Sequence, residues 1–252
     1  MAIGLFVLGD EILSGKRQDK HLSKVIELLA VRGMTLDWAR FIGDDEDRIV
    51  DAIRTVRRDG DVLFSCGGIG ATPDDRTRQA AARAFDVPLE RHAEAAALIQ
   101  AEYGDQAFPN RVLMADFPRG SALIPNPINR VAGFSCGDCY FVPGFPEMAW
   151  PMIGWVLEHR LQKLWRADPD AEFRLRAFGA GEGDLLELMQ QTLARFPEVK
   201  LSSLPFRGDA TTARHIEFGI KGAREKAEQA FLWFRSQLEM RSGVTIEPLP
   251  TR

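Results

Sequence analysis

Apolar and polar positions alternate along residues 1–85 in a pattern that predicts three strand–helix repeats. Residues 2–8 are almost continuously apolar, which is typical of a buried parallel strand. Leu22, Val25, Ile26 and Leu29 then recur at the spacing of one helix face. The same order follows twice more, with strands expected at 36–42 and 61–64 and helices that begin near residues 43 and 72. This alternation favours a parallel sheet covered by helices.

The pattern becomes less regular over residues 90–159. Residues 90–103 are expected to be helical, whereas residues 104–129 contain four prolines and predict a long surface loop with one short strand near 122–124. Residues 131–135 and 140–142 predict a hairpin around Cys136-Gly137-Asp138-Cys139. A helix then continues to about residue 159.

A polar turn at Ala167-Asp168-Pro169-Asp170 predicts a domain boundary. We expect domains at 1–167 and 168–252. The second has strands at 172–178, 199–206, 214–221 and 244–248, and helices at 183–195 and 223–240. The order βαββαβ is the ferredoxin-like arrangement. The predicted fold class is therefore a doubly wound, mostly parallel α/β sheet with a smaller ferredoxin-like α+β domain.

Composition narrows the classes of function. A formal net charge of −4 gives no basic footprint for nucleic acid, so no nucleic-acid partner is expected. No apolar run reaches the length of about 18 residues that a membrane span needs. The apolar start lacks the basic flank of a signal peptide and is interpreted as a first strand. An odd, low count of three cysteines indicates a reducing compartment, and we expect a cytoplasmic protein.

Cys136 and Cys139 form an isolated C-x-x-C pair. A structural zinc site needs a second pair of ligands, and the four histidines are scattered at positions 21, 92, 159 and 215. The Gly137-Asp138 pair between the cysteines is therefore interpreted as a hairpin turn.

The stretch Ser65 to Thr77 is the first candidate site. It follows a predicted buried strand, contains Gly67, Gly68 and Gly70, and precedes an alanine-rich helix. Glycine lets a ligand approach the backbone, and a helix start attracts phosphate. Asp74 and Asp75 add carboxylates that suit Mg²⁺ or another hard divalent ion. The alternative is a plain helix cap, with Thr72 as N-cap, a proline at the first helical position and an acid at the third.

Other polar residues follow neighbouring strands. Gly9-Asp10-Glu11 come directly after the first strand, where open α/β sheets bind ligands, although a simple turn would have the same composition. Asp44 and Glu147 lie at predicted helix starts, where an acid is stabilising without any ligand.

Four separated motifs occur in one order along residues 1–160. They are Gly9-Asp10-Glu11-Ile12-Leu13, Gly67-Gly68-Ile69-Gly70-Ala71-Thr72-Pro73-Asp74-Asp75-Arg76-Thr77, Asn126-Pro127 and Pro143-Gly144-Phe145-Pro146-Glu147-Met148. Together they resemble the molybdopterin-binding-domain family, and within it the N-terminal part of the competence/damage-inducible protein A branch. The second domain is similar to that branch through its glycine-rich segment at 179–185. The C-terminal amidohydrolase domain of the branch is expected to be missing.

The resemblance implies a site that binds molybdopterin or an adenine dinucleotide, and it implies a homo-oligomer. Asp75 matches the family aspartate that serves adenylylation of molybdopterin or metal insertion, and Asp44 matches a second one. In the competence-protein branch the resemblance implies metal-dependent cleavage of a pyrophosphate, with ADP-ribose or a similar substrate.

The sequence also departs from the branch at three places. Ala71 stands where the branch has proline, Asp19-Lys20-His21 stands for Asp-Thr-Asn, and Asn129-Arg130 stands for Gly-Thr. Basic side chains near these departures are alternative phosphate ligands, namely Lys16, Lys20 and Arg130.

We therefore expect a hydrolase for pyrophosphate bonds, with Asp75, Asp44 and Glu147 as catalytic residues and Asp74 and Asp75 as metal ligands. The expected ligand contacts are Gly9, Asp10, Glu11, Gly67, Gly68, Gly70, Thr72, Thr77, Asn126, Pro143 and Gly144. Two alternatives stay open: a non-catalytic protein that binds molybdopterin or a nucleotide, and an enzyme of molybdenum-cofactor biosynthesis.

Overall fold

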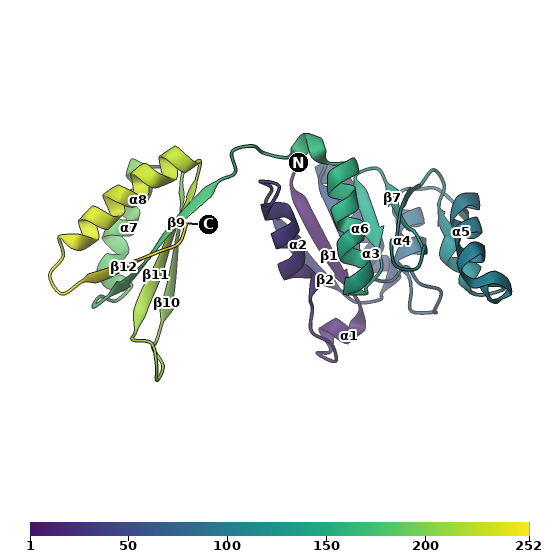
Figure 1. Ribbon diagram of the computed structural model, residues 1–252, viewed down its shortest axis with the longest axis horizontal. Helices are drawn as coiled ribbons and strands as arrows, with labels where there is room; N and C mark the ends of the chain where they lie inside the picture. The colour runs from purple at the N-terminus through teal and green to yellow at the C-terminus, as the bar shows by residue number, and fades with distance from the viewer. Residues whose placement is uncertain (252) are drawn as a thin grey trace. The chain divides into compact units, whose positions relative to one another are not determined.

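The computed structural model describes residues 1–251 and divides the chain between Trp165 and Arg166 into two compact units (Figure 1). Each unit has its own hydrophobic core. Among the described residues, no helix has both the length and the apolar character that crossing a bilayer requires.

The described residues of the first unit form a six-stranded sheet in the order β2-β1-β3-β8-β7-β6. The pairs β1–β2, β1–β3 and β3–β8 are parallel, whereas β8–β7 and β7–β6 are antiparallel. The strands are β1 (Ile3–Leu8), β2 (Trp38–Ile42), β3 (Val62–Cys66), β6 (Ala122–Ile124), β7 (Gly133–Cys136) and β8 (Cys139–Val142).

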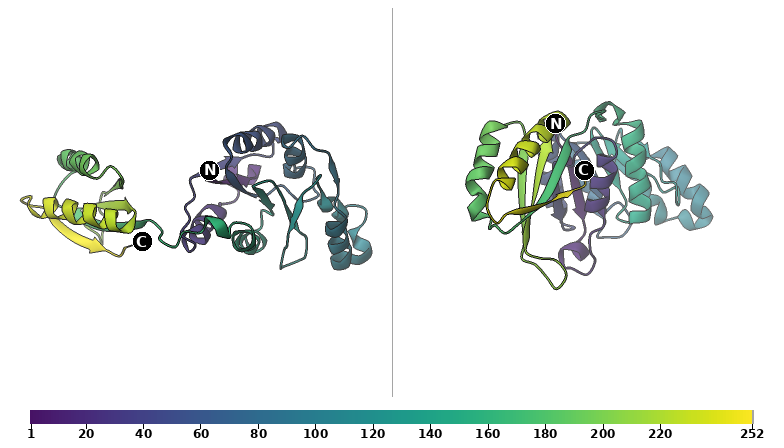
Figure 2. Two further views of the ribbon diagram at one scale, coloured as in Figure 1. Left: turned by 90° about the horizontal axis from the view of Figure 1, so that it is seen from above. Right: turned by 60° about the vertical axis from the view of Figure 1, so that its left-hand side comes forward.

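Helices cover both faces of this sheet (Figure 1; Figure 2). In β1, Leu5 and Val7 join the core under α2 (His21–Ala30) and α6 (Pro146–His159), whereas Phe6 joins the core under α3 and α4. Alternate residues of a strand point to opposite faces, so an unbroken apolar run serves both cores. This arrangement confirms the doubly wound class. Helices α3 and α4 span Glu46–Asp59 and Thr77–Ala84.

The order of the strands creates a switch point between β1 and β3. The chain leaves β1 toward β2 on one side and then returns to place β3 on the other side of β1. The loops that follow β1 and β3 therefore depart in different directions at the carboxyl edge of the sheet. Crevices at such points are where open α/β sheets bind ligands.

The short strand predicted near 122–124 is confirmed as β6, but the prediction that the rest of residues 104–129 is a long surface loop is wrong. This segment contains two 3₁₀ turns (Gly104–Ala107 and Arg111–Ala115), β5 (Asp116–Pro118) and β6. Strand β5 pairs with β4 (Leu89–Arg91), and Phe117 is buried against Phe134 with ring centroids 4.7 Å apart. Elements this short repeat a hydrophobic period too few times for the pattern to be recognised in the sequence. The helix expected at 90–103 is α5 (Ala93–Tyr103).

The hairpin and the helix expected after this segment are confirmed. Strands β7 and β8 pair antiparallel through Cys136 and Cys139, and Gly137 has the left-handed φ of 55° that a tight turn needs. Two short elements were not expected, namely α1 (Asp10–Leu13) and a 3₁₀ turn at Gln162–Leu164.

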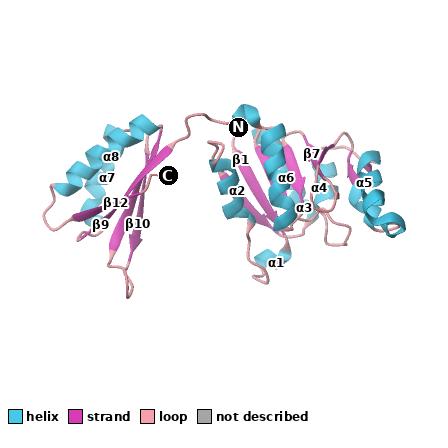
Figure 3. Cartoon of the chain, viewed as in Figure 1, coloured by secondary structure: helices cyan, strands magenta, loops and turns pink. Residues whose placement is uncertain are grey.

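Residues 166–251 form a four-stranded antiparallel sheet in the order β10-β11-β9-β12, with two helices (Figure 3). Phe218 of β11 and Phe234 of α8 are fully buried and meet with ring centroids 5.0 Å apart. The ferredoxin-like arrangement is confirmed. Its elements are β9 (Ala171–Phe178), a 3₁₀ turn (Gly183–Leu185), α7 (Leu186–Arg195), β10 (Lys200–Phe206), β11 (His215–Gly222), α8 (Arg224–Glu239) and β12 (Thr245–Leu249).

Candidate functional site

A cavity of about 420 Å³, called the main cavity below, lies where β1, β3 and β8 end. Gly9 and Glu11 follow β1, the glycine-rich loop (residues 67–72) follows β3, and Pro143 and Gly144 follow β8. Parallel strands place their carboxyl ends at one edge, so three segments distant in sequence form one wall.

The glycine-rich loop brings bare backbone to the cavity. Gly68 has a left-handed φ of 69°, and a Cβ there would lie 2.3 Å from Thr77 Oγ1. A Cβ on Gly70 would lie 2.4 Å from Asp75 Oδ2. The Thr77 hydroxyl donates to the Gly67 carbonyl oxygen at 2.9 Å, and its N–H donates to the Gly68 carbonyl at 3.0 Å. The loop therefore requires glycine for both its backbone angles and its close contacts.

Four consecutive amides of this loop have no partner. Within residues 1–251, the N–H groups of Gly68, Ile69, Gly70 and Ala71 donate to no protein acceptor, and all four residues line the main cavity. Unpaired amides in a glycine-rich turn ahead of a helix are a suitable site for an anionic oxygen.

The helix-cap interpretation of this stretch is wrong. Helix α4 begins at Thr77, and the N-cap position is Arg76, whose side chain makes no capping hydrogen bond. Thr72 to Asp75 instead close a turn, in which Asp75 Oδ2 accepts the Thr72 N–H at 2.9 Å and also its hydroxyl. The Asp75 N–H returns a bond to the Thr72 carbonyl oxygen at 3.0 Å. Local side-chain bonds of this kind compete with helix formation.

Arg78 fixes the outer end of the loop. Its buried guanidinium donates to the carbonyl oxygens of Gly70 at 2.6 Å, Leu113 at 2.5 Å and Asp116 at 3.2 Å. Burial lowers the pKa of Arg78, and the nearby Asp116 carboxylate opposes that effect. Sequence reasoning missed this residue, because arginine is rarely buried and a lone arginine in a helix carries no distinguishing signal.

Asp10 and Asp44 connect the loops after β1 and β2. Each carboxylate accepts the backbone N–H of the other residue, at 3.1 Å for Asp10 N–H and 3.2 Å for Asp44 N–H. Burial raises the pKa of Asp44, and the charges of Asp10, Glu11 and Asp74 raise it further, while the bond from the Asp10 amide lowers it. Asp44 lines the main cavity and Asp10 does not.

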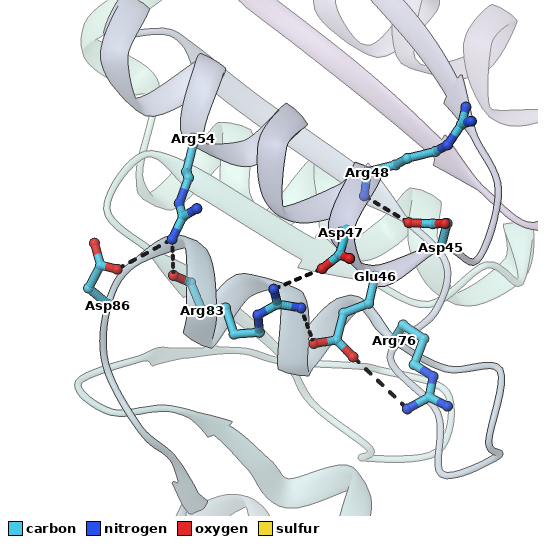
Figure 4. A network of polar contacts seen from close by, with 8 residues as sticks. All are labelled: Asp45, Glu46, Asp47, Arg48, Arg54, Arg76, Arg83 and Asp86. Carbon is cyan, nitrogen blue, oxygen red and sulfur yellow. Dashed lines mark hydrogen bonds and ion pairs between the residues drawn. The ribbon is translucent and has the colours of Figure 1, made fainter.

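An ion-pair network joins the start of α3 to the last turn of α4 and to Arg76, which precedes α4 (Figure 4). Arg83 contacts Glu46 and Asp47, each at 2.8 Å, and Arg76 lies 4.0 Å from Glu46. Exposed pairs of this kind contribute only about 0.2–1 kcal/mol each. Their role is geometric, because they connect the segment that carries Asp44 to the segment that carries Asp75.

The structure brings most of the sequence-predicted site residues together. Those that line the main cavity are Gly9, Glu11, Asp44, Gly67, Gly68, Gly70, Thr72, Asp74, Asp75, Asn126, Pro143 and Gly144. Thr77 lies beneath the loop and supports it. Glu147 is exposed in the first turn of α6 and lines no part of the main cavity. An acid at that position stabilises the helix start without a ligand.

Other residues of the main cavity were not expected. They are Leu8, Arg17, Ile69, Ala71, Tyr103, Met114, Asn129, Val131, Phe145 and Met148. Phe145 and Met148 lie inside a motif that the sequence already singled out. Met114 comes from the segment whose short elements the sequence did not disclose, and Tyr103 is the last residue of α5. Asn126 is buried, and its amide donates to Asn129 Oδ1 at 2.8 Å and to the Val131 carbonyl at 3.1 Å.

The donors around the main cavity fit a metal ion only together with a ligand. Among the described residues, no group of three or more His, Cys, Asp or Glu side chains is placed to hold an ion. Mg²⁺ is commonly held by one or two carboxylates together with substrate phosphates and water. Asp44, Asp74 and Asp75 supply carboxylates beside amides that suit phosphate, so the residues fit a metal ion that arrives with a phosphate-bearing ligand.

The fold and the site define a small-molecule-binding α/β domain. Residues 4–163 match the family model described as a probable molybdopterin binding domain. The chain belongs to this family.

The relatives agree with the branch that the sequence motifs indicated. A CinA-like protein of Citrifermentans bemidjiense is 28% identical over 262 residues, which cover 95% of this chain and 61% of that protein. A CinA-like protein of Syntrophotalea carbinolica is 33% identical over 208 residues, which cover 78% of this chain and 49% of that protein. The chain thus spans between 49% and 61% of the length of these curated relatives.

A solved structure shows the same fold for the first unit. The crystal structure of the protein CinA from Thermoplasma acidophilum, a protein of unknown function, is 26% identical with a TM-score of 0.58. The match covers 63% of this chain and 98% of that one.

Proposed function

We propose that the main cavity binds a phosphate-bearing ligand of the molybdopterin or adenine-dinucleotide type, and that the protein hydrolyses its pyrophosphate bond with a divalent metal ion. The observation that carries this proposal is the glycine-rich loop, which presents the unpaired amides of Gly68 to Ala71 at the switch point of the sheet. The volume of about 420 Å³ lies within the range of small-molecule sites. The family description supports a pterin ligand.

The charges around the cavity support the metal. Glu11, Asp44, Asp74 and Asp75 line it, and Arg17 is the one cationic side chain among its described lining residues. A phosphate placed beside these acids alone would be repelled. A bound divalent ion would offset most of that charge, polarise the phosphoryl oxygen and lower the pKa of a water molecule.

The protein's own residues would orient the ligand and accept a proton. The loop amides would hold one phosphate, and the backbone of Gly68 and Gly70 allows it to approach closely. Asp75 is held by Thr72 through Oδ2, so Oδ1 is available to the cavity. Asp44 is the candidate base, because its raised pKa brings it closer to the value that a general base needs.

One observation favours a second candidate, a protein that binds the same ligand without turnover. The described residues hold no preformed cluster of three acidic or metal-ligating side chains. Both candidates share the phosphate-binding loop. A role in molybdenum-cofactor biosynthesis would add ATP as a substrate for adenylylation of molybdopterin.

The cytoplasmic location and the homo-oligomer stay predictions from the sequence and the resemblance. The cysteines are free and buried at positions 66, 136 and 139, which supports a reducing compartment.

The test is an assay of purified protein with ADP-ribose and Mg²⁺, Mn²⁺ or Co²⁺, with AMP as the measured product. Metal-dependent AMP release is expected, and chelation should abolish it. Saturable binding without AMP release under all three metals would replace the hydrolase with the non-catalytic binder. ATP consumption that depends on molybdopterin would indicate the biosynthetic enzyme instead.

A further inference from the structure

A second cavity of about 330 Å³, called the second compartment below, adjoins the main cavity. The two share Glu11, Arg17, Gly144 and Phe145 as lining residues. The second compartment extends along the segment before α2 and adds Lys20. A ligand held by the glycine-rich loop in the main cavity can therefore extend past these shared residues into the second compartment.

The two compartments differ in charge. Asp19, which lines the second compartment, is engaged at the start of α2, where its carboxylate oxygens accept the N–H groups of His21 at 2.8 Å and Leu22 at 3.0 Å. The helix N-terminus offsets the charge of a carboxylate held in this way. Within residues 1–251, Arg17 and Lys20 form no ion pair. The second compartment thus sets two unpaired cations against Glu11 and the engaged Asp19, whereas the main cavity sets Arg17 alone against four acids.

His21 joins the two sides of this wall. Its side chain is only 5% exposed, and its Nε2 donates to the Gly144 carbonyl oxygen at 3.1 Å. This bond holds the start of α2 against the loop after β8, and both segments line the second compartment. Burial lowers the pKa of His21, so the cationic side chains of the compartment are Arg17 and Lys20.

We infer that the second compartment binds a second phosphate of the same ligand, next to Lys20 and Arg17. The inference rests on the proposed function and narrows its substrate class. The ligand is a nucleotide with two separated phosphate-bearing ends, such as an adenine dinucleotide with an additional phosphate on a ribose. A pterin with a single phosphate would leave Lys20 without a partner.

The test compares two ligands that differ by one phosphate, ADP-ribose and ADP-ribose 2′-phosphate, by calorimetric titration of the full chain, with Ca²⁺ in place of the activating metal so that the ligands are not hydrolysed during the titration. We expect the additional phosphate to tighten binding about tenfold, which corresponds to about 1.4 kcal/mol. Lys20→Gln should remove this preference while leaving the affinity for ADP-ribose within about twofold of the unmodified protein.

Lys24→Gln is the matched control. Lys24 lies one turn further along α2, pairs with Glu27 at 2.7 Å and lines neither compartment. Lys24→Gln removes the same charge as Lys20→Gln but outside both compartments, so the preference for the additional phosphate should persist. Circular dichroism checks that both variants fold.

Equal affinity of the unmodified protein for the two ligands would contradict the second phosphate site but not the proposed function. A preference for the additional phosphate that survives Lys20→Gln would do the same. Failure of both ligands to bind overturns the proposed function together with this inference.

Discussion

Asp10 and Asp44, 34 residues apart in sequence, each accept a hydrogen bond from the other's backbone N–H. The exchange joins the loops after β1 and β2 and holds Asp44 at the wall of the main cavity. It also keeps two carboxylates close together, and this proximity raises the pKa of Asp44 beyond the effect of burial. The arrangement costs the folded protein stability at neutral pH and keeps a proton acceptor beside the site.

Asp44→Asn should abolish the charge without removing the oxygen that accepts the Asp10 N–H. The pKa of Asp44 is higher in the folded state than in the unfolded state, where an aspartate titrates near about pH 4. Above that pH, the folded state therefore still holds a proton on Asp44 that the unfolded state has lost. Stability from this group is therefore present at lower pH and is lost as the pH rises through the folded pKa. Urea unfolding measured at a series of pH values should show that the free energy of unfolding of Asp44→Asn falls less steeply with rising pH than that of the unmodified protein.

The control for Asp44→Asn is Asp51→Asn, an exposed aspartate on α3 that lines neither cavity. It should reproduce the profile of the unmodified protein. Identical pH profiles for all three proteins would contradict the assigned role of the Asp10–Asp44 exchange. Turnover of a pyrophosphate substrate should fall by about a hundredfold or more in Asp44→Asn only, as expected for loss of a general base.

Gly68→Ala should weaken ligand binding at least about tenfold, because the new Cβ would lie 2.3 Å from Thr77 Oγ1 and would displace the loop. Gly60→Ala is a matched control, since Gly60 has the same φ of 69° but no atom within 4 Å of the Cβ position. Both variants should lose about 1 kcal/mol or more of stability from the left-handed backbone. Equal ligand affinities in the two variants would show that the loop does not contact the ligand.

Arg78→Met should lower the free energy of unfolding by about 2–4 kcal/mol, because three buried carbonyl oxygens lose their donor. Arg48→Met, at an exposed position of α3 whose side chain makes no recorded contact, should change it by less than about 0.5 kcal/mol. Denaturant unfolding measures both values. A change in Arg78→Met as small as in Arg48→Met would contradict the role of Arg78 as the anchor of the glycine-rich loop.

Asp75→Asn distinguishes a functional carboxylate from a structural one. The asparagine oxygen can still accept the Thr72 N–H, and α4 begins two residues later without a side-chain cap from Asp75. The melting temperature should therefore stay close to that of the unmodified protein, while turnover falls about a hundredfold or more. A large fall in melting temperature with unchanged turnover would assign Asp75 to the turn alone.

The sequence was sufficient to predict those helices and strands in which apolar residues recur at a regular spacing. The apolar run of residues 2–8 and the helical spacing of Leu22 to Leu29 were sufficient to predict a sheet covered on both sides. The glycine-rich loop was placed at a strand end for the same reason, and the main cavity lies there.

The remaining features depend on contacts between distant segments. Arg78 meets Leu113 and Asp116 only after the chain has folded, and the Asp10–Asp44 exchange depends on strand order. The helix-cap interpretation failed because the Asp75 carboxylate bonds to Thr72 and closes a turn before α4 can begin. Local composition does not reveal which of two local hydrogen-bond patterns prevails.

The most direct test of the central claim is calorimetric titration of the full chain with ADP-ribose, FAD, NAD and ATP, each without metal and with Ca²⁺ in place of the activating metal, so that no ligand is hydrolysed during the titration. The account predicts saturable binding of at least one phosphate-bearing ligand at one site per chain, weakened at least about tenfold by Gly68→Ala and retained by Gly60→Ala. Absence of binding across the whole panel, or binding that Gly68→Ala leaves unchanged, would contradict it.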